Sequence, residues 1–151
     1  MYTDGSSRGN PGPGGYGTIL MWKGQRKELS GGFRFTTNNR MELMSVIAGL
    51  EALSREGLLI TVHSDSQYVV NAVEKGWLKN WIATNFKGGK KNKDLWIHYN
   101  ELAKKHSIRF KWVRGHTDNA FNNRCDELAT AAADGNHLEV DEVFEAENKK
   151  K

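Results

Sequence analysis

The fold is decided by residues 39–65, which read NRMELMSVIAGLEALSREGLLITVHSD. Over about 39–56 the apolar residues recur at helical spacing, so this part predicts an amphipathic helix. The apolar stripe comprises Leu43, Val46, Ile47, Leu50 and Leu53. LLITVH at 58–63 is a continuous apolar run, which is typical of a buried strand in a parallel sheet. Asp65 lies just beyond that strand, where open α/β sheets gather their ligand-binding groups.

The flanking segments predict three strands before this unit and alternating elements after it. A very short strand ends at Asp4, and a glycine- and proline-rich loop, GNPGPGGYG at 9–17, follows it. Strands at 16–22 and about 27–35 form a hairpin with a turn at Lys23–Gly24. Further elements are expected as helices at about 66–74, 94–105 and 122–133 and a strand at 108–113. This order predicts an α/β fold with a five-stranded mixed sheet, three strands antiparallel and then two parallel, flanked by helices.

Composition places the chain among single-domain globular proteins. It has 151 residues, a net charge of +4 and one cysteine, which excludes an internal disulfide framework and predicts a cytoplasmic protein. The sequence has no apolar run long enough to span a membrane and no signal-peptide pattern. The expected organisation is a catalytic domain at 1–135, with a basic protrusion at 75–93, and a polar acidic tail at 136–151 for which no structure is predicted. We expect a monomer.

Four acidic residues, Asp4, Glu42, Asp65 and Asp126, stand near the ends of predicted elements. Taken singly, Glu42 and Asp126 fit the first turn of a helix, where an acid favours the helix dipole, so a structural role is a full alternative for each. If the first and fourth strands are neighbours, however, Asp4 and Asp65 converge. Clustered carboxylates repel one another and raise each other's pKa, and a bound cation relieves that cost. Hard oxygen ligands of this kind suit Mg²⁺ or Mn²⁺.

Five motifs taken together make the chain resemble the type 1 ribonuclease H family over residues 2 to about 133. They are YTDGS with GNPGPGGYG, TTNNRMEL, SDSQYV, WVRGH and NNRCDELA, in that order. The resemblance implies a ribonuclease H-like fold and an endonuclease that hydrolyses the RNA strand of RNA–DNA hybrids, its nucleic-acid partner. It implies that the metal ligands are Asp4, Glu42, Asp65 and Asp126 and that His116 assists catalysis.

The implied mechanism is hydrolysis with two Mg²⁺ ions, or Mn²⁺, about 4 Å apart at the scissile phosphate. The expected products carry 5′-phosphate and 3′-hydroxyl ends. His116 is expected to move a proton or to assist product release.

Substrate selection requires contacts to the 2′-hydroxyl, which both donates and accepts hydrogen bonds. By resemblance, the amides that read the hybrid are those of Asn10, Asn38, Asn39 and Gln67. Asn38 and Asn39 have a structural alternative as helix caps. A pocket for a DNA-strand phosphate is expected to consist of Thr37, Arg40 and Asn92.

The basic protrusion resembles the basic helix and loop of some family members, and we expect its lysines to contact DNA phosphates. The lysines expected to do so are Lys79, Lys87, Lys90 and Lys91. Trp77 and Trp81 share one helical face, and they are expected to pack the protrusion onto the domain rather than to stack on bases. Two other functions stay open: a transposase, integrase or proofreading exonuclease on the same sheet, or a hybrid-binding module without catalysis.

Overall fold

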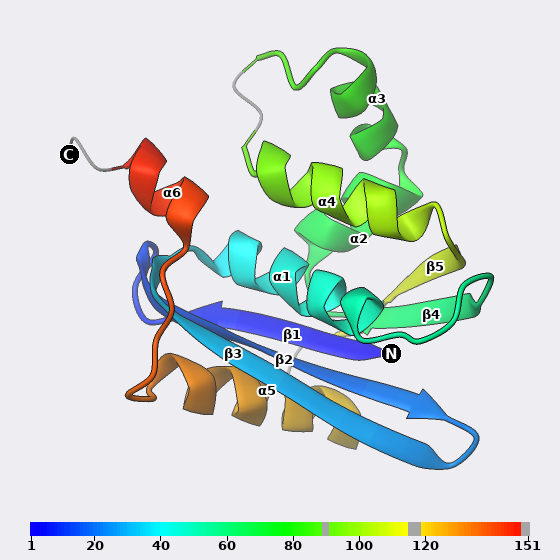
Figure 1. Cartoon of the computed structure of the whole chain (residues 1–151), viewed down its shortest axis with the longest axis horizontal. Helices are drawn as coiled ribbons and strands as arrows, with labels where there is room; N and C mark the ends of the chain where they lie inside the picture. Colours follow the sequence, from blue (N-terminus) through cyan, green and yellow to red (C-terminus); the bar gives the residue numbers. More distant parts are fainter. Residues whose placement is uncertain (89–90, 115–118, 149–151) are drawn as a thin grey trace.

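One mixed sheet of five strands organises the part of the chain that the computed structural model describes, residues 1–88, 91–114 and 119–148 (Figure 1). The strands lie in the order β3-β2-β1-β4-β5. The first three pair in antiparallel fashion, whereas β4 pairs in parallel with both β1 and β5. Their bounds are β1 Tyr2–Ser7, β2 Gly12–Trp22, β3 Gln25–Thr36, β4 Leu59–Ser64 and β5 Ser107–Trp112. The predicted fold class is confirmed.

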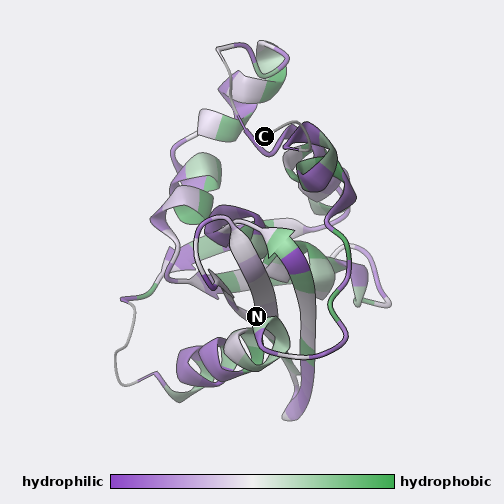
Figure 2. Ribbon diagram, turned by 90° about the vertical axis from the view of Figure 1, so that its left-hand side faces the viewer, coloured by the Kyte–Doolittle hydropathy of each residue, from purple (hydrophilic) through white to green (hydrophobic). Residues whose placement is uncertain are grey.

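Helices cover both faces of the sheet. α5 packs on β1, β2 and β3 from one face, and α1 packs on β1 and β2 from the other, with α4 against α1 (Figure 1). The helices are α1 Asn38–Glu51, α2 Gln67–Glu74, α3 Trp77–Ala83, α4 Lys93–Ala103, α5 Ala120–Ala133 and α6 Glu142–Glu147. In the described ranges, none of these helices has the length and apolar character needed to cross a membrane. Hydrophilic and hydrophobic residues alternate along the helices (Figure 2).

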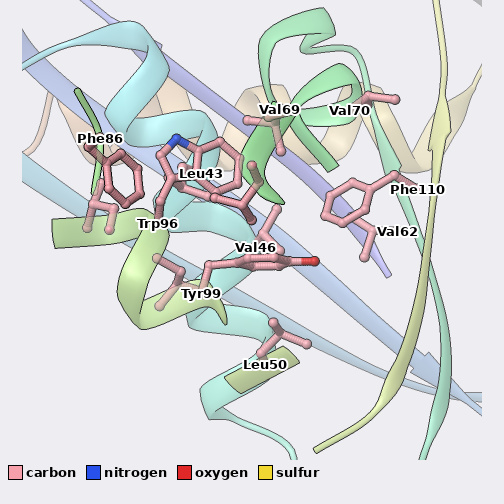
Figure 3. Packing of buried hydrophobic residues seen from close by; sticks show 14 residues of the cluster. Leu43, Val46, Leu50, Val62, Val69, Val70, Phe86, Trp96, Tyr99 and Phe110 are labelled. Atoms are coloured by element: carbon pink, nitrogen blue, oxygen red, sulfur yellow. The ribbon is translucent and has the colours of Figure 1, made fainter. Parts of the chain in front are cut away.

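The main hydrophobic core lies between α1, α4, α2 and the parallel half of the sheet. Trp96 and Tyr99 of α4 lie against Leu43 and Val46 of α1, and all four are almost fully buried (Figure 3). Val62 on β4 and Phe110 on β5 complete the cluster from the sheet. The predicted apolar stripe of α1 is therefore the core face, although the helix ends at Glu51 rather than at about 56.

The glycine-rich segment was expected to be a loop, and this expectation is wrong for most of it. Only the residues before Gly12 form the turn, and β2 begins at Gly12. The reason is helix packing: a Cβ at Gly15 or Gly17 would collide with backbone atoms of α5. Glycine here allows α5 to lie directly on the strand. The hairpin at Lys23–Gly24 is confirmed, and both residues have the positive φ that its two-residue turn requires.

The C-terminal tail, for which no structure was predicted, contains a short helix, α6, and an isolated bridge from Glu139 to β3. Its backbone pairs with β3 through Glu139, which donates to Gly32 O and accepts from Arg34 N, both at 2.9 Å. α6 follows, and Glu145 forms an ion pair with Arg34. Asp141 is buried. Two acids of the tail, Asp141 and Glu145, have cationic partners on the domain, Arg40 and Arg34, and composition alone cannot reveal such partners.

The close packing of α5 on β2 generates a stability prediction. In Gly17→Ala the new methyl group meets Cys125 O and, at 2.7 Å, the Leu128 Cβ, so helix and strand must separate. We expect the free energy of unfolding to fall by about 1–3 kcal/mol in urea titrations. Ser30→Ala, on the exposed residue paired with Gly17, is the control and should change stability by less than about 0.5 kcal/mol. Equal stability of the two variants would contradict the packing argument.

Candidate active site

Three of the four predicted carboxylates meet at the carboxyl end of β4. One carboxylate oxygen each from Asp4, Glu42 and Asp65 lies within 4.8 Å of the other two. This convergence was expected only if the first and fourth strands are neighbours. In the structure β1 and β4 are parallel neighbours, with Tyr2 opposite His63. Asp4 lies within β1 rather than at its end, because pairing with β2 continues to Ser7. Asp65 directly follows β4.

The approach of α1 to β1 brings the third carboxylate to the other two. A Cβ on Gly5 would collide with the backbone nitrogen of Glu42 and with the carbonyl of Met41. The missing side chain therefore lets α1 touch the strand one residue after Asp4. This glycine, in the motif TDGS, determines how close Glu42 lies to Asp4.

Helix capping does not account for Glu42 or Asp126. α1 begins at Asn38 with Thr37 as its N-cap, and α5 begins at Ala120 with Asn119 as its N-cap. Both acids therefore lie beyond the first turn in which they were expected, and the dipole of that turn does not explain them. Asp126 is outside the close cluster, but its charge still raises the pKa of Asp4.

Burial and mutual repulsion shift Asp4 and Glu42 strongly toward their protonated forms. Burial, followed by the charge of Asp65, raises the pKa of Asp4 to about 8, although Gly5 N donates to its carboxylate at 2.9 Å. Burial and then the charges of Asp4 and Asp65 raise the pKa of Glu42 well above its usual range. Protein groups would thus supply little compensation if all three carboxylates were ionised.

The cluster fits a hard divalent cation. Glu42 Oε1 and Asp65 Oδ1 are buried, and neither has a hydrogen-bond partner in the described part of the chain. Unpaired buried acceptors are rare, and here two of them belong to carboxylates that converge on one point. Oxygen-only ligands with net negative charge suit Mg²⁺ or Mn²⁺. A third such acceptor, Asn122 Oδ1, lies one helical turn before Asp126.

The predicted amides lie around the N-terminal ends of α1 and α2. Asn10, in the turn after β1, accepts a hydrogen bond from Asn38 N at 3.1 Å and so ties that turn to α1. Asn38 and Asn39 are the first two residues of α1 rather than its cap. Gln67 is exposed as the first residue of α2, two positions after Asp65.

Arg40 differs from its predicted role. Its side chain is buried, and its five N–H groups donate to Asp141, Asp94 and Asn92 at 2.7–3.3 Å. In this arrangement Arg40 has no donor left for a phosphate. Thr37 caps α1 by accepting from Arg40 N, and Asn92 donates to the Tyr68 hydroxyl. Asp94, Asp141 and Tyr68 were absent from the predicted site, and the one signal for Asp94 was its place in the NKD sequence that begins α4.

The basic protrusion is α3 with the segment that follows it. Lys79, Lys87 and Lys91 are exposed, and Lys90 lies outside the described residues, as does His116. Trp81 packs onto the domain as expected, with ring centroids 5.9 Å from Trp96 and 6.3 Å from Tyr68. Trp77 stays 39% exposed beside Trp81.

Comparisons with known proteins agree on one family. The sequence profile of the RNase H family matches residues 1–134. A ribonuclease H from Desulforamulus reducens is 53% identical over 145 residues, covering 93% of this chain and 91% of that protein. One from Syntrophus aciditrophicus is 51% identical over 93% of this chain and 83% of that protein.

Two solved structures resemble the fold. LC9-RNase H1, described as a type 1 RNase H with the type 2 active-site motif, superposes with a TM-score of 0.77 at 30% identity. That match covers 87% of this chain and 70% of the other. LC11-RNase H1 in complex with an RNA/DNA hybrid has a TM-score of 0.64 at 27% identity, covering 88% of this chain and 94% of the other.

The raised pKa of Asp4 predicts how stability depends on pH in chelator. From about pH 4, where an unfolded aspartate ionises, up to about pH 8, the folded protein retains a proton that the unfolded chain releases. Stability from this group is therefore lost as the pH rises. Asp4→Asn should melt above the parent protein, by a margin that grows between pH 5 and pH 8.5. Glu101→Gln, at an exposed residue, is the control. A margin independent of pH would contradict the assignment.

Proposed function

Because the chain belongs to the ribonuclease H family and is a ribonuclease H endonuclease, we propose that it hydrolyses the RNA strand of RNA–DNA hybrids with Mg²⁺ at the carboxylate cluster. One observation carries the cation proposal. Asp4, Glu42 and Asp65 converge within 4.8 Å, and two of their buried oxygens have no partner in the described residues. Such a cluster is costly unless a cation occupies it.

Asp4, Glu42, Asp65 and the more distant Asp126 are the proposed metal ligands. Two Mg²⁺ ions bound there would activate a water for in-line attack on phosphorus and stabilise the leaving 3′-oxygen. The carboxylates would orient the scissile phosphate by fixing the cations to β1, α1 and the end of β4. Cleavage of the bond to the 3′-oxygen leaves 5′-phosphate and 3′-hydroxyl products. His116 is proposed to accept or donate a proton during the reaction.

The amides at the N-terminal ends of α1 and α2 are the proposed readers of the hybrid. Asn10, Asn38, Asn39 and Gln67 lie next to elements that carry Glu42 or Asp65. Their carboxamides can both donate to and accept from a 2′-hydroxyl, which DNA lacks. The hybrid bound by LC11-RNase H1 supports a hybrid as the substrate class.

A DNA-strand phosphate is proposed to bind at Thr37 and Asn92. Thr37 retains its hydroxyl hydrogen, and Asn92 has a second amide hydrogen beyond the one given to Tyr68. Arg40 is then a positioning residue, because its side chain donates to Asn92 Oδ1 at 3.3 Å and its backbone N–H donates to the Thr37 hydroxyl. The exposed lysines of the protrusion would contact further phosphates of the same strand.

The proposal is tested with a hybrid labelled on the RNA strand, incubated with Mg²⁺ or with chelator. We expect cleavage of RNA only, only with the cation, and with 5′-phosphate ends. Asp4→Asn, Asp65→Asn and Asp126→Asn should each lower the rate by orders of magnitude while the circular dichroism spectrum stays native. Equal cleavage of duplex DNA would favour the transposase or exonuclease alternatives, and tight hybrid binding without cleavage would favour the binding module.

The exposed lysines generate a separate prediction about salt. Lys87→Ala combined with Lys91→Ala should raise KM for the hybrid and leave kcat near normal, because the carboxylates are untouched. The logarithm of the binding constant for the hybrid should depend less steeply on the logarithm of the salt concentration, by up to about two units of slope. Lys104→Ala with Lys105→Ala, exposed beyond the end of α4, is the matched control. An unchanged slope, or the same change in the control pair, would show that the protrusion does not contact phosphate.

A further inference from the structure

Trp112 lies beside the carboxylate cluster, and no step described so far uses it. From its contacts we infer that Trp112 is a positioning residue that holds the backbone of Asp65 so that the carboxylate meets the cation. The inference rests on the proposed metal site. It assigns a role in cation binding to a side chain that is not itself one of the proposed metal ligands.

The contact that carries the inference joins the end of β5 to the residue after β4. Trp112 is the last residue of β5 and is paired with Ser64. Its indole Nε1–H donates to the main-chain oxygen of Asp65 at 3.2 Å, although the side chain is 45% exposed. An exposed indole could give this hydrogen to water. The hydrogen bond to Asp65 instead joins the two strand ends across the edge of the site.

Asp65 needs such support because its own side chain has little. Its Oδ1 has no hydrogen-bond partner in the described residues, and its carboxylate lies beside the carboxyl groups of Asp4 and Glu42. Only two torsions separate an aspartate carboxylate from its backbone, so the backbone sets where the carboxylate lies. The neighbouring serines are already held, since Ser66 N donates to Ser64 Oγ and Val113 N donates to Ser64 O. The indole hydrogen bond extends this support to Asp65.

The alternative is that Trp112 only covers apolar surface at the strand end. Two substitutions separate a role of the N–H from a role of the ring. Trp112→Phe keeps much of the ring and removes the donor. Trp112→His is smaller, but its Nε2 lies the same number of bonds from Cβ as the indole Nε1, so it retains a ring N–H. If the N–H donor matters, Trp112→His should bind Mg²⁺ more tightly than Trp112→Phe does. If only packing matters, Trp112→Phe should bind Mg²⁺ more tightly than Trp112→His does.

The experiment measures Mg²⁺ binding without nucleic acid, by calorimetry and by the rise in melting temperature with Mg²⁺, at pH 8 where free histidine is neutral. We expect Trp112→Phe to weaken Mg²⁺ binding by about tenfold and Trp112→His to restore most of the loss. Trp22→Phe, at a 54% exposed tryptophan near the hairpin tip, is the matched control and should bind as the parent protein does. In cleavage assays, Trp112→Phe should need a higher Mg²⁺ concentration for its half-maximal rate, and its KM for the hybrid should be unchanged.

Several results would overturn the inference. They are parental Mg²⁺ affinity in Trp112→Phe, weaker binding in Trp112→His than in Trp112→Phe, and an equal loss in Trp22→Phe. A lower melting temperature of Trp112→Phe in chelator with unchanged affinity would assign a packing role and also overturn it. Parent protein that binds Mg²⁺ but leaves the hybrid intact would instead count against the proposed function, and the order of affinities would still decide the role of Trp112.

Discussion

Repulsion among three converging carboxylates, two of them buried, is the constraint on which the rest of the structure depends. Asp4, Glu42 and Asp65 come from a strand, a helix and the end of another strand, so no single element can relieve their repulsion by shifting alone. Gly5 lets α1 touch β1, and the parallel pairing of β1 with β4 brings Asp65 to the same place. Burial raises the pKa of Asp4 and of Glu42. The fold therefore maintains an arrangement that electrostatics opposes, and a cation bound at the proposed site would relieve that opposition.

A second charged cluster, about Arg40, shows the opposite solution. This buried guanidinium uses all five of its N–H groups within the protein, on Asp94, Asp141 and Asn92. Although burial disfavours its charge, the hydrogen bonds to Asp94 and Asp141 outweigh that cost and raise the pKa of Arg40. Arg40 joins α1, the start of α4 and the C-terminal segment, so it organises the structure beside the proposed phosphate pocket. A buried charge whose hydrogen bonds are all made within the protein indicates a structural role, whereas buried acceptors without a partner indicate a candidate binding site.

The exposed lysines of the basic protrusion form a third group of charges, distinct from the carboxylate cluster and from the Arg40 cluster. Lysines on and after α3 are exposed, whereas Trp81 packs against Trp96 and Tyr68. The protrusion therefore contacts the domain through aromatic side chains and presents its charge to solvent. Trp96 Nε1 and Asn92 Nδ2 both donate to the Tyr68 hydroxyl, which links that aromatic attachment to Asn92 and through it to Arg40. The same network thus supports the protrusion and the proposed phosphate pocket.

The sequence by itself determined the order and type of the strands and main helices, because apolar periodicity and turn residues are local signals. It also supplied Asp4, Glu42, Asp65 and Asp126 as candidates through motifs in register. Only the tertiary structure decided that the glycines after Pro11 form a strand, because their conformation follows from the packing of α5. Only it decided that Arg40 pairs with Asp141, 101 residues away, and so joins the polar tail to α1. The hydrogen bond from Trp112 to Asp65 belongs to the same class, since it joins strand ends 47 residues apart. Contacts between distant residues leave no periodicity in the chain, and their energy is realised only once the sheet has brought the partners together.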